Sequence, residues 1–122
     1  MPFIYNGSKD TPEIILDKEK NVYKITGNSF QDDPYIVYKF VHEWLDGFVK
    51  DPSSSMNFEI KLNYVNTASS KQIADILIRL EELSGICEVK VLWYYDDEDD
   101  GMLDEGETLS DMINVEFEFV EY

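Results

Sequence analysis

Hydrophobic and polar residues alternate in some parts of the chain and recur every three to four positions in others, so the two spacings separate strands from helices. Alternating or short apolar runs bounded by turn residues predict strands at residues 13–17, 22–26, 58–65, 88–95 and 115–120. The first two strands are separated by a polar turn and are expected to form a hairpin. Residues 1–12 carry turn signals and are expected to form an arm.

Helical spacing appears in three stretches between these strands. The first helix is predicted to start at Asp32-Asp33-Pro34, with an aspartate cap followed by proline in the first turn. Its buried face is expected to comprise Val37, Phe40, Val41, Trp44 and Phe48. The second helix is predicted at residues 69–83, with a buried stripe of Ile73, Ile76, Leu77, Leu80 and Leu83. A shorter third helix is predicted at residues 103–112.

The predicted elements follow the order strand, strand, helix, strand, helix, strand, helix, strand. Strands separated by helices favour parallel pairing through crossovers, and the opening hairpin makes the sheet mixed. The strand at residues 58–65 has one apolar and one polar side, so the helices are expected mainly on its apolar side. We therefore expect a single α/β domain over residues 1–122, with a mixed sheet of about five strands.

The formal charge of −16, from 26 acidic and 10 basic residues, limits the classes of partner. Nucleic acid and anionic membrane surfaces are disfavoured, because no cationic surplus is available to meet their phosphates. The acidity suits a basic protein partner, or solubility alone. With Cys87 as the single cysteine, no signal-peptide pattern in the first residues and no apolar run of ~20 residues, a cytoplasmic protein is expected.

No catalytic or cofactor-binding motif is recognisable in the sequence, so the chain is not expected to be an enzyme or to carry a cofactor. His42 is the single histidine and Cys87 the single thiol, and they fall on different predicted elements. Glycine-rich phosphate-binding motifs are missing, and four cysteine or histidine ligands for zinc do not exist.

An acidic run after the strand at residues 88–95 resembles a calcium-binding loop. The positions of an EF-hand loop numbered 1, 3, 5, 6, 8 and 12 would fall on Asp96, Glu98, Asp100, Gly101, Leu103 and Glu107. However, an EF-hand loop follows a helix, and here a strand is predicted before it. A solvated acidic loop, or a docking surface for a basic partner, is therefore the better interpretation, and a calcium-binding module remains an alternative.

Three hydroxyl residues, Thr67, Ser69 and Ser70, lie where the strand at residues 58–65 meets the second helix. Ser69 and Gln72 fit a capping box, which leaves Thr67 free outside the helix. A phosphate on Thr67 or Ser69 would meet unpaired N–H groups and the helix dipole, a stabilisation of ~0.3–1 kcal/mol. The same phosphate would obstruct a protein interface, because it adds about −1.5 to −2 charge. A simple helix start is the alternative.

The chain also contains, in this order, Thr11-Pro12, Gly27-Asn28-Ser29-Phe30, the run from Phe58 to Lys71, Ile76-Leu77, Leu80-Glu81-Glu82 and Trp93-Tyr94-Tyr95-Asp96. On these segments it resembles the SiaC family of bacterial regulatory phosphoproteins. The resemblance implies a non-enzymatic domain similar to anti-sigma-factor antagonists. It also implies phosphorylation on threonine by a dedicated serine/threonine kinase and dephosphorylation by a PP2C-type phosphatase. The unphosphorylated form is implied to activate a diguanylate cyclase, and so to act in cyclic di-GMP signalling and biofilm behaviour.

The family threonine matches Thr67, which the resemblance implies is the phosphorylation site. The chain departs from the family pattern at Ala68-Ser69-Ser70, where Thr-Ser-Ser without the alanine is expected, so Ser69 is a second candidate. The expected partner-binding residues are Asn66, Thr67, Ser69, Ser70 and Lys71. The alternatives are a constitutive acidic adaptor protein, or a calcium-binding module that uses Asp96, Glu98, Asp100 and Glu107.

Overall fold

The computed structural model describes residues 2–122, which form a six-stranded sheet and three helices. The strands are β1 (Phe3–Tyr5), β2 (Glu13–Asp17), β3 (Val22–Ser29), β4 (Ser55–Val65), β5 (Glu88–Tyr95) and β6 (Glu116–Glu121). The helices are α1 (Tyr35–Phe48), α2 (Thr67–Leu83) and α3 (Asp100–Met112).

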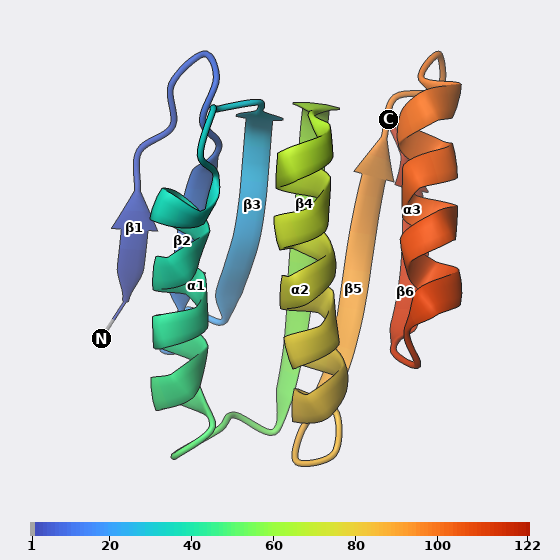
Figure 1. The fold of residues 1–122 in the computed structure, drawn as a ribbon. Helices are drawn as coiled ribbons and strands as arrows, with labels where there is room; N and C mark the ends of the chain where they lie inside the picture. Colours follow the sequence, from blue (N-terminus) through green and yellow to red (C-terminus); the bar gives the residue numbers. More distant parts are fainter. Residues whose placement is uncertain (1) are drawn as a thin grey trace.

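The strands lie in the sheet in the same order as in the chain. β1, β2 and β3 pair antiparallel, whereas β3, β4, β5 and β6 pair parallel through the helices that connect them. All three helices cover one face of the sheet, and the other face is left uncovered (Figure 1). The predicted mixed α/β sheet with helices on one face is therefore confirmed.

The structure has one strand more than predicted, because part of the expected arm is β1. Phe3 pairs with Leu16 and Tyr5 with Ile14, and the ring of Phe3 stacks on Phe40 with centroids 5.8 Å apart. A strand of three residues is too short to show an alternating pattern, so the sequence does not predict it. It forms because β2 is beside it to pair with.

The first helix differs from its prediction at its start and along its buried face. Pro34 occupies the N-cap position without a side-chain hydrogen bond, so the predicted aspartate cap is wrong. Tyr38 and Leu45 are buried, while Phe40 is 38% exposed. Tyr38 can lie inside because its hydroxyl is 2.8 Å from Ser29 Oγ, a buried partner that the helical pattern cannot reveal.

The core lies between the sheet and the three helices. The buried side of β4 comprises Met56, Phe58, Ile60 and Leu62. The predicted stripe on the second helix is confirmed, since Ile73, Ile76, Leu77, Leu80 and Leu83 are all buried. Within residues 2–122, no helix has both the length and the apolar content that crossing a bilayer requires.

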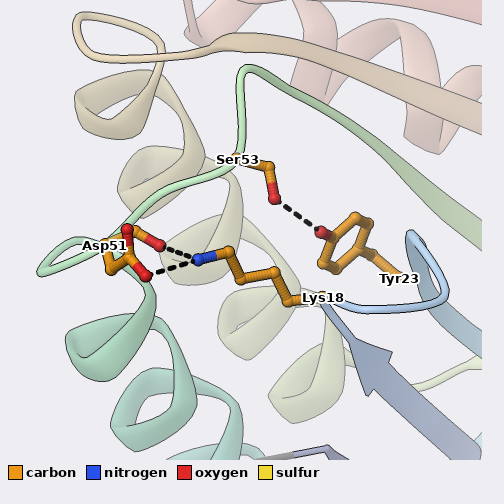
Figure 2. A network of polar contacts seen from close by, with 4 residues as sticks. All are labelled: Lys18, Tyr23, Asp51 and Ser53. Carbon is orange, nitrogen blue, oxygen red and sulfur yellow. Dashed lines mark hydrogen bonds and ion pairs between the residues drawn. The ribbon is translucent and has the colours of Figure 1, made fainter.

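Two long-range contacts attach the α1–β4 loop to the β2–β3 hairpin (Figure 2). Lys18 Nζ lies 3.0 Å from Asp51 Oδ2 and also donates to the Asp51 carbonyl oxygen. The Tyr23 hydroxyl lies 3.4 Å from Ser53 Oγ. These contacts lie at the edge where β4 begins, and α2 begins at the opposite edge (Figure 1).

Candidate functional site

The candidate site lies at the edge of the sheet where the parallel strands β3, β4 and β5 end and the helices begin (Figure 1). Open α/β sheets usually bind their ligands outside the carboxyl ends of the strands. The hydroxyl residues predicted from the sequence are at the junction between β4 and α2.

Asn66 caps α2, and the predicted capping box of Ser69 with Gln72 is wrong. The Oδ1 atom of Asn66 accepts a hydrogen bond from the Ser69 N–H at 2.8 Å. Its Nδ2 group donates to the Gln31 carbonyl oxygen at 3.3 Å, and its own N–H donates to the Ser29 carbonyl oxygen at 3.0 Å. Asparagine is as good a cap as serine, and its position starts the helix at Thr67, earlier than predicted.

The hydroxyl side chains of the first helical turn have different surroundings. Thr67, predicted to precede the helix, is its first residue and is exposed to solvent. Ser69 is fully buried, and its Oγ atom has no hydrogen-bond partner within the described residues. Ser70 donates a hydrogen bond to the Glu105 carboxylate on α3. The Thr67 side chain is therefore accessible from solvent, whereas Ser69 faces the interior.

A groove of about 630 Å³ lies between the end of β4, the first half of α2 and α3. It is lined by Asn66, Thr67, Ser70 and Lys71, which are four of the predicted partner-binding residues, and Ser69 is not among its lining residues. Its apolar lining comprises Val65, Ala74, Met102, Leu109 and Met112. The volume is in the usual range for binding pockets, ~300–1,000 Å³.

The contribution of α3 to this site is not predictable from the sequence pattern. Met102, Glu105, Leu109 and Met112 follow one another at three- and four-residue steps and line the groove together. The periodicity identified a helix at 103–112, but no local pattern shows which neighbour that helix faces. A glycine in the middle of the helix, Gly106, was the one local signal of a close helix–sheet contact.

Gly106 allows α3 to lie directly on Trp93 of β5. A Cβ atom at Gly106 would be 2.5 Å from Trp93 Cδ1, which is far below contact distance. The Trp93 Nε1–H donates to the Met102 carbonyl oxygen at 3.0 Å, so the buried indole has its hydrogen bond. This packing places the side of α3 that carries Glu105 against the first turn of α2.

The acidic run does not form an EF-hand loop. The strand β5 enters it, and α3 begins at Asp100, so Asp100 and Glu107 of the proposed loop lie on a helix. Asp99 Oδ1 caps that helix by accepting from the Met102 N–H at 2.9 Å, and Asp96 Oδ1 accepts from the Glu98 N–H at 2.9 Å. Among residues 2–122 there is no group of three or more side chains able to hold a metal ion.

His42 and Cys87 contribute nothing to the groove. His42 lies on α1 with Nδ1 3.4 Å from a guanidinium nitrogen of Arg79, and its pKa is lowered by desolvation and by that positive charge. Cys87 is buried before β5, and burial raises the pKa of its thiol. Neither residue lines the groove beside Thr67.

Comparisons with known proteins agree on the kind of protein. A family model described as SiaC family regulatory phosphoprotein matches residues 5–122. An uncharacterised protein of Pseudomonas aeruginosa (strain UCBPP-PA14) is 32% identical over 91 residues, which are 74% of this chain and 72% of the relative.

Solved structures of SiaC from Pseudomonas aeruginosa have the same fold. Apo-SiaC superposes with a TM-score of 0.89 at 26% identity, covering 98% of each chain. A structure of the diguanylate cyclase SiaD in complex with its activator SiaC gives a TM-score of 0.90 at 26% identity, covering 98% of this chain and 99% of the matched chain.

Proposed function

Since the chain belongs to the SiaC family of regulatory phosphoproteins, we propose that it binds a signalling partner through the surface around Thr67 and that phosphorylation of Thr67 switches this binding. The observation that carries the proposal is the position of Thr67, an exposed hydroxyl at the N-terminus of α2 and on the border of the groove. The proposed partner is a diguanylate cyclase, because a SiaC from Pseudomonas aeruginosa is the activator of the cyclase SiaD.

The N-terminus of α2 can carry a phosphate without loss of the fold. The first-turn N–H groups and the positive end of the helix dipole stabilise an anion by ~0.3–1 kcal/mol when it is exposed. Lys71 is exposed four residues after Thr67, so both side chains lie on the same side of the helix. Lys71 can therefore pair with the phosphate, and the modified protein is expected to remain folded.

A partner that covers Thr67 would lose affinity when the phosphate is present. The group adds about −1.5 to −2 charge, and burying such a charge without a pairing cation costs several kcal/mol. Each ~1.4 kcal/mol corresponds to a tenfold change in affinity, so a hundredfold switch is available. The proposal includes a cognate serine/threonine kinase and a PP2C-type phosphatase in the cytoplasm, and assigns no catalysis to the chain itself.

The test is the affinity of the protein for the diguanylate cyclase of its own organism, measured by calorimetry. Thr67→Asp is expected to weaken binding at least tenfold, whereas Thr67→Val, which keeps the shape without charge, is expected to bind like the wild type. Circular dichroism controls for folding. A natively folded Thr67→Asp that bound as tightly as the wild type would refute the switch.

A second measurement tests phosphorylation directly. The intact mass of the protein purified from its own host, with its kinase present, is expected to show a phosphorylated fraction that Thr67→Val lacks. A chain that is never modified would instead favour the constitutive adaptor.

A further inference from the structure

The groove beside Thr67 has an elongated apolar surface. Met112 lies ten positions after Met102 on the helix, and a helix rises about 1.5 Å per residue, so the α3 side of the groove is about 15 Å long. Two large apolar side chains of the groove are exposed to solvent: Met112 is 61% exposed and Tyr64 is 54% exposed. An elongated surface of this kind fits several side chains of a protein segment better than one small molecule.

The two sides of the groove are lined by charges of opposite sign. Every charged residue after Lys90 in the sequence is acidic, and of these Asp99 and Glu105 line the groove on its α3 side. Lys71 is the basic residue among those that line the groove, and it lies on α2. A partner segment complementary to both sides must be basic where it faces α3 and uncharged or acidic where it faces α2.

We propose that the groove between α2 and α3 binds an apolar partner segment whose lysine or arginine side chains face α3; this rests on the proposed function, in which the partner docks around Thr67. A second copy of this chain does not fit, because its own α3 would bring more negative charge to the groove. Anionic nucleic acid and anionic membrane are disfavoured for the same reason.

This arrangement gives the Thr67 phosphate a specific effect. The phosphate pairs with Lys71 and changes the α2 side of the groove from positive to negative. The side of the partner segment that faced Lys71 then faces the phosphate. If that side is acidic, the two negative charges repel each other. If it is uncharged, it desolvates the phosphate. The switch thus acts through the α2 side of the groove, while α3 supplies the attraction for the basic side chains.

The inference is tested with fluorescein-labelled synthetic peptides of equal length, measured by fluorescence anisotropy. The first combines leucine with lysine, the second leucine with glutamate, and the third serine with lysine. The leucine–lysine peptide is expected to bind at least tenfold more tightly than the other two. Equal binding of the second or third peptide, or no binding of the first, would overturn the inference.

Variants of the protein locate the binding. The double variant Met112→Gln with Glu105→Gln is expected to weaken binding of the leucine–lysine peptide at least tenfold. Glutamine at position 105 keeps an oxygen that can accept the hydrogen bond from Ser70. The matched control is Ile86→Gln with Glu82→Gln, because Ile86 is 56% exposed and both residues lie outside this groove. An equal loss in the control pair would show non-specific binding and refute the groove.

The two proposals fail in different ways. If Thr67→Asp loses the cyclase but the Met112 and Glu105 variants still bind it fully, the groove inference is wrong and the switch stands. If the groove variants lose both the peptide and the cyclase while Thr67→Asp keeps the cyclase, the switch is wrong and the groove stands.

Discussion

At the scale of single residues, position on the helix decides which hydroxyl is exposed to solvent. Thr67, Ser69 and Ser70 lie within one turn of α2, yet Thr67 is exposed, Ser69 is buried and Ser70 is bonded to Glu105. The cap at Asn66 fixes this arrangement, since it sets the residue at which the helix starts and therefore the direction of each side chain. A single cap thus separates the candidate acceptor from its neighbours.

Tyr38 is expected to make the protein less stable at alkaline pH. Burial raises the pKa of Tyr38 from 10.0 to about 12, because the neutral phenol is favoured in the folded state. The unfolded chain loses this proton first, so the stabilisation is complete below pH 10 and is lost as pH rises toward 12. In urea unfolding, wild type is expected to lose about 1 kcal/mol more than Tyr38→Phe between about pH 9 and about pH 11.

The Tyr38→Phe variant is the control, because all other titrating groups are shared. An identical pH dependence of the free energy of unfolding in both proteins would contradict the assignment to Tyr38.

At the scale of elements, the position of α3 on the sheet decides whether the groove exists. The helix lies against the indole of Trp93, and Gly106 is the residue at the contact. Its register is fixed by this contact and by the cap at Asp99. Because Met102, Leu109 and Met112 form the apolar lining on this side, a shift of α3 would change the candidate site directly.

Gly106→Ala is expected to destabilise the fold even though alanine favours helices. The added Cβ would lie 2.5 Å from two atoms of the Trp93 ring, and such overpacking costs about 1–3 kcal/mol. Urea unfolding measures the loss, and binding of the leucine–lysine peptide is expected to weaken with it. Gly47→Ala on α1 is the matched control: nothing lies within 4 Å of its Cβ, so it should gain up to ~1 kcal/mol. Equal stabilisation by both substitutions would show that α3 is not held by this contact.

At the scale of the whole molecule, negative charge is distributed unevenly. The net charge is −16, and the part of the chain that forms α3 and β6 contributes acidic residues without basic ones. Lys90 on β5 compensates for part of this charge, with Nζ 2.7 Å from Glu118 and 3.6 Å from Glu116. The remaining repulsion is a cost to folding and a source of attraction for a basic partner.

Moderate salt is expected to stabilise the protein. Between about 0.01 M and about 0.15 M sodium chloride the Debye length falls from about 30 Å to about 8 Å, which screens the repulsion among acidic residues. The midpoint of thermal unfolding should therefore rise across this range. Asp104→Asn combined with Asp111→Asn should raise the midpoint at low salt and reduce the response. A midpoint that falls with added salt would mean that attractive ion pairs dominate.

The sequence by itself determined the local features. Three- and four-residue spacing placed the buried stripe of α2, and the order of elements determined a mixed sheet. Alternation placed β4, and its single apolar side put the helices on one face. The junction around Thr67 and the membership of the SiaC family were also accessible from the residues. The elements were predictable because each depends on neighbours within a few positions in the chain.

Only the tertiary structure decided which distant residues meet. The short strand β1 needs β2 as its template, and Tyr38 is buried because Ser29 meets its hydroxyl. The groove needs α3 beside α2, a contact between residues far apart in the chain, as the hydrogen bond from Ser70 to Glu105 illustrates. Periodicity indicates which side of a helix is buried, but not which element covers that side. The α3 side of the candidate site is therefore visible only in the folded protein.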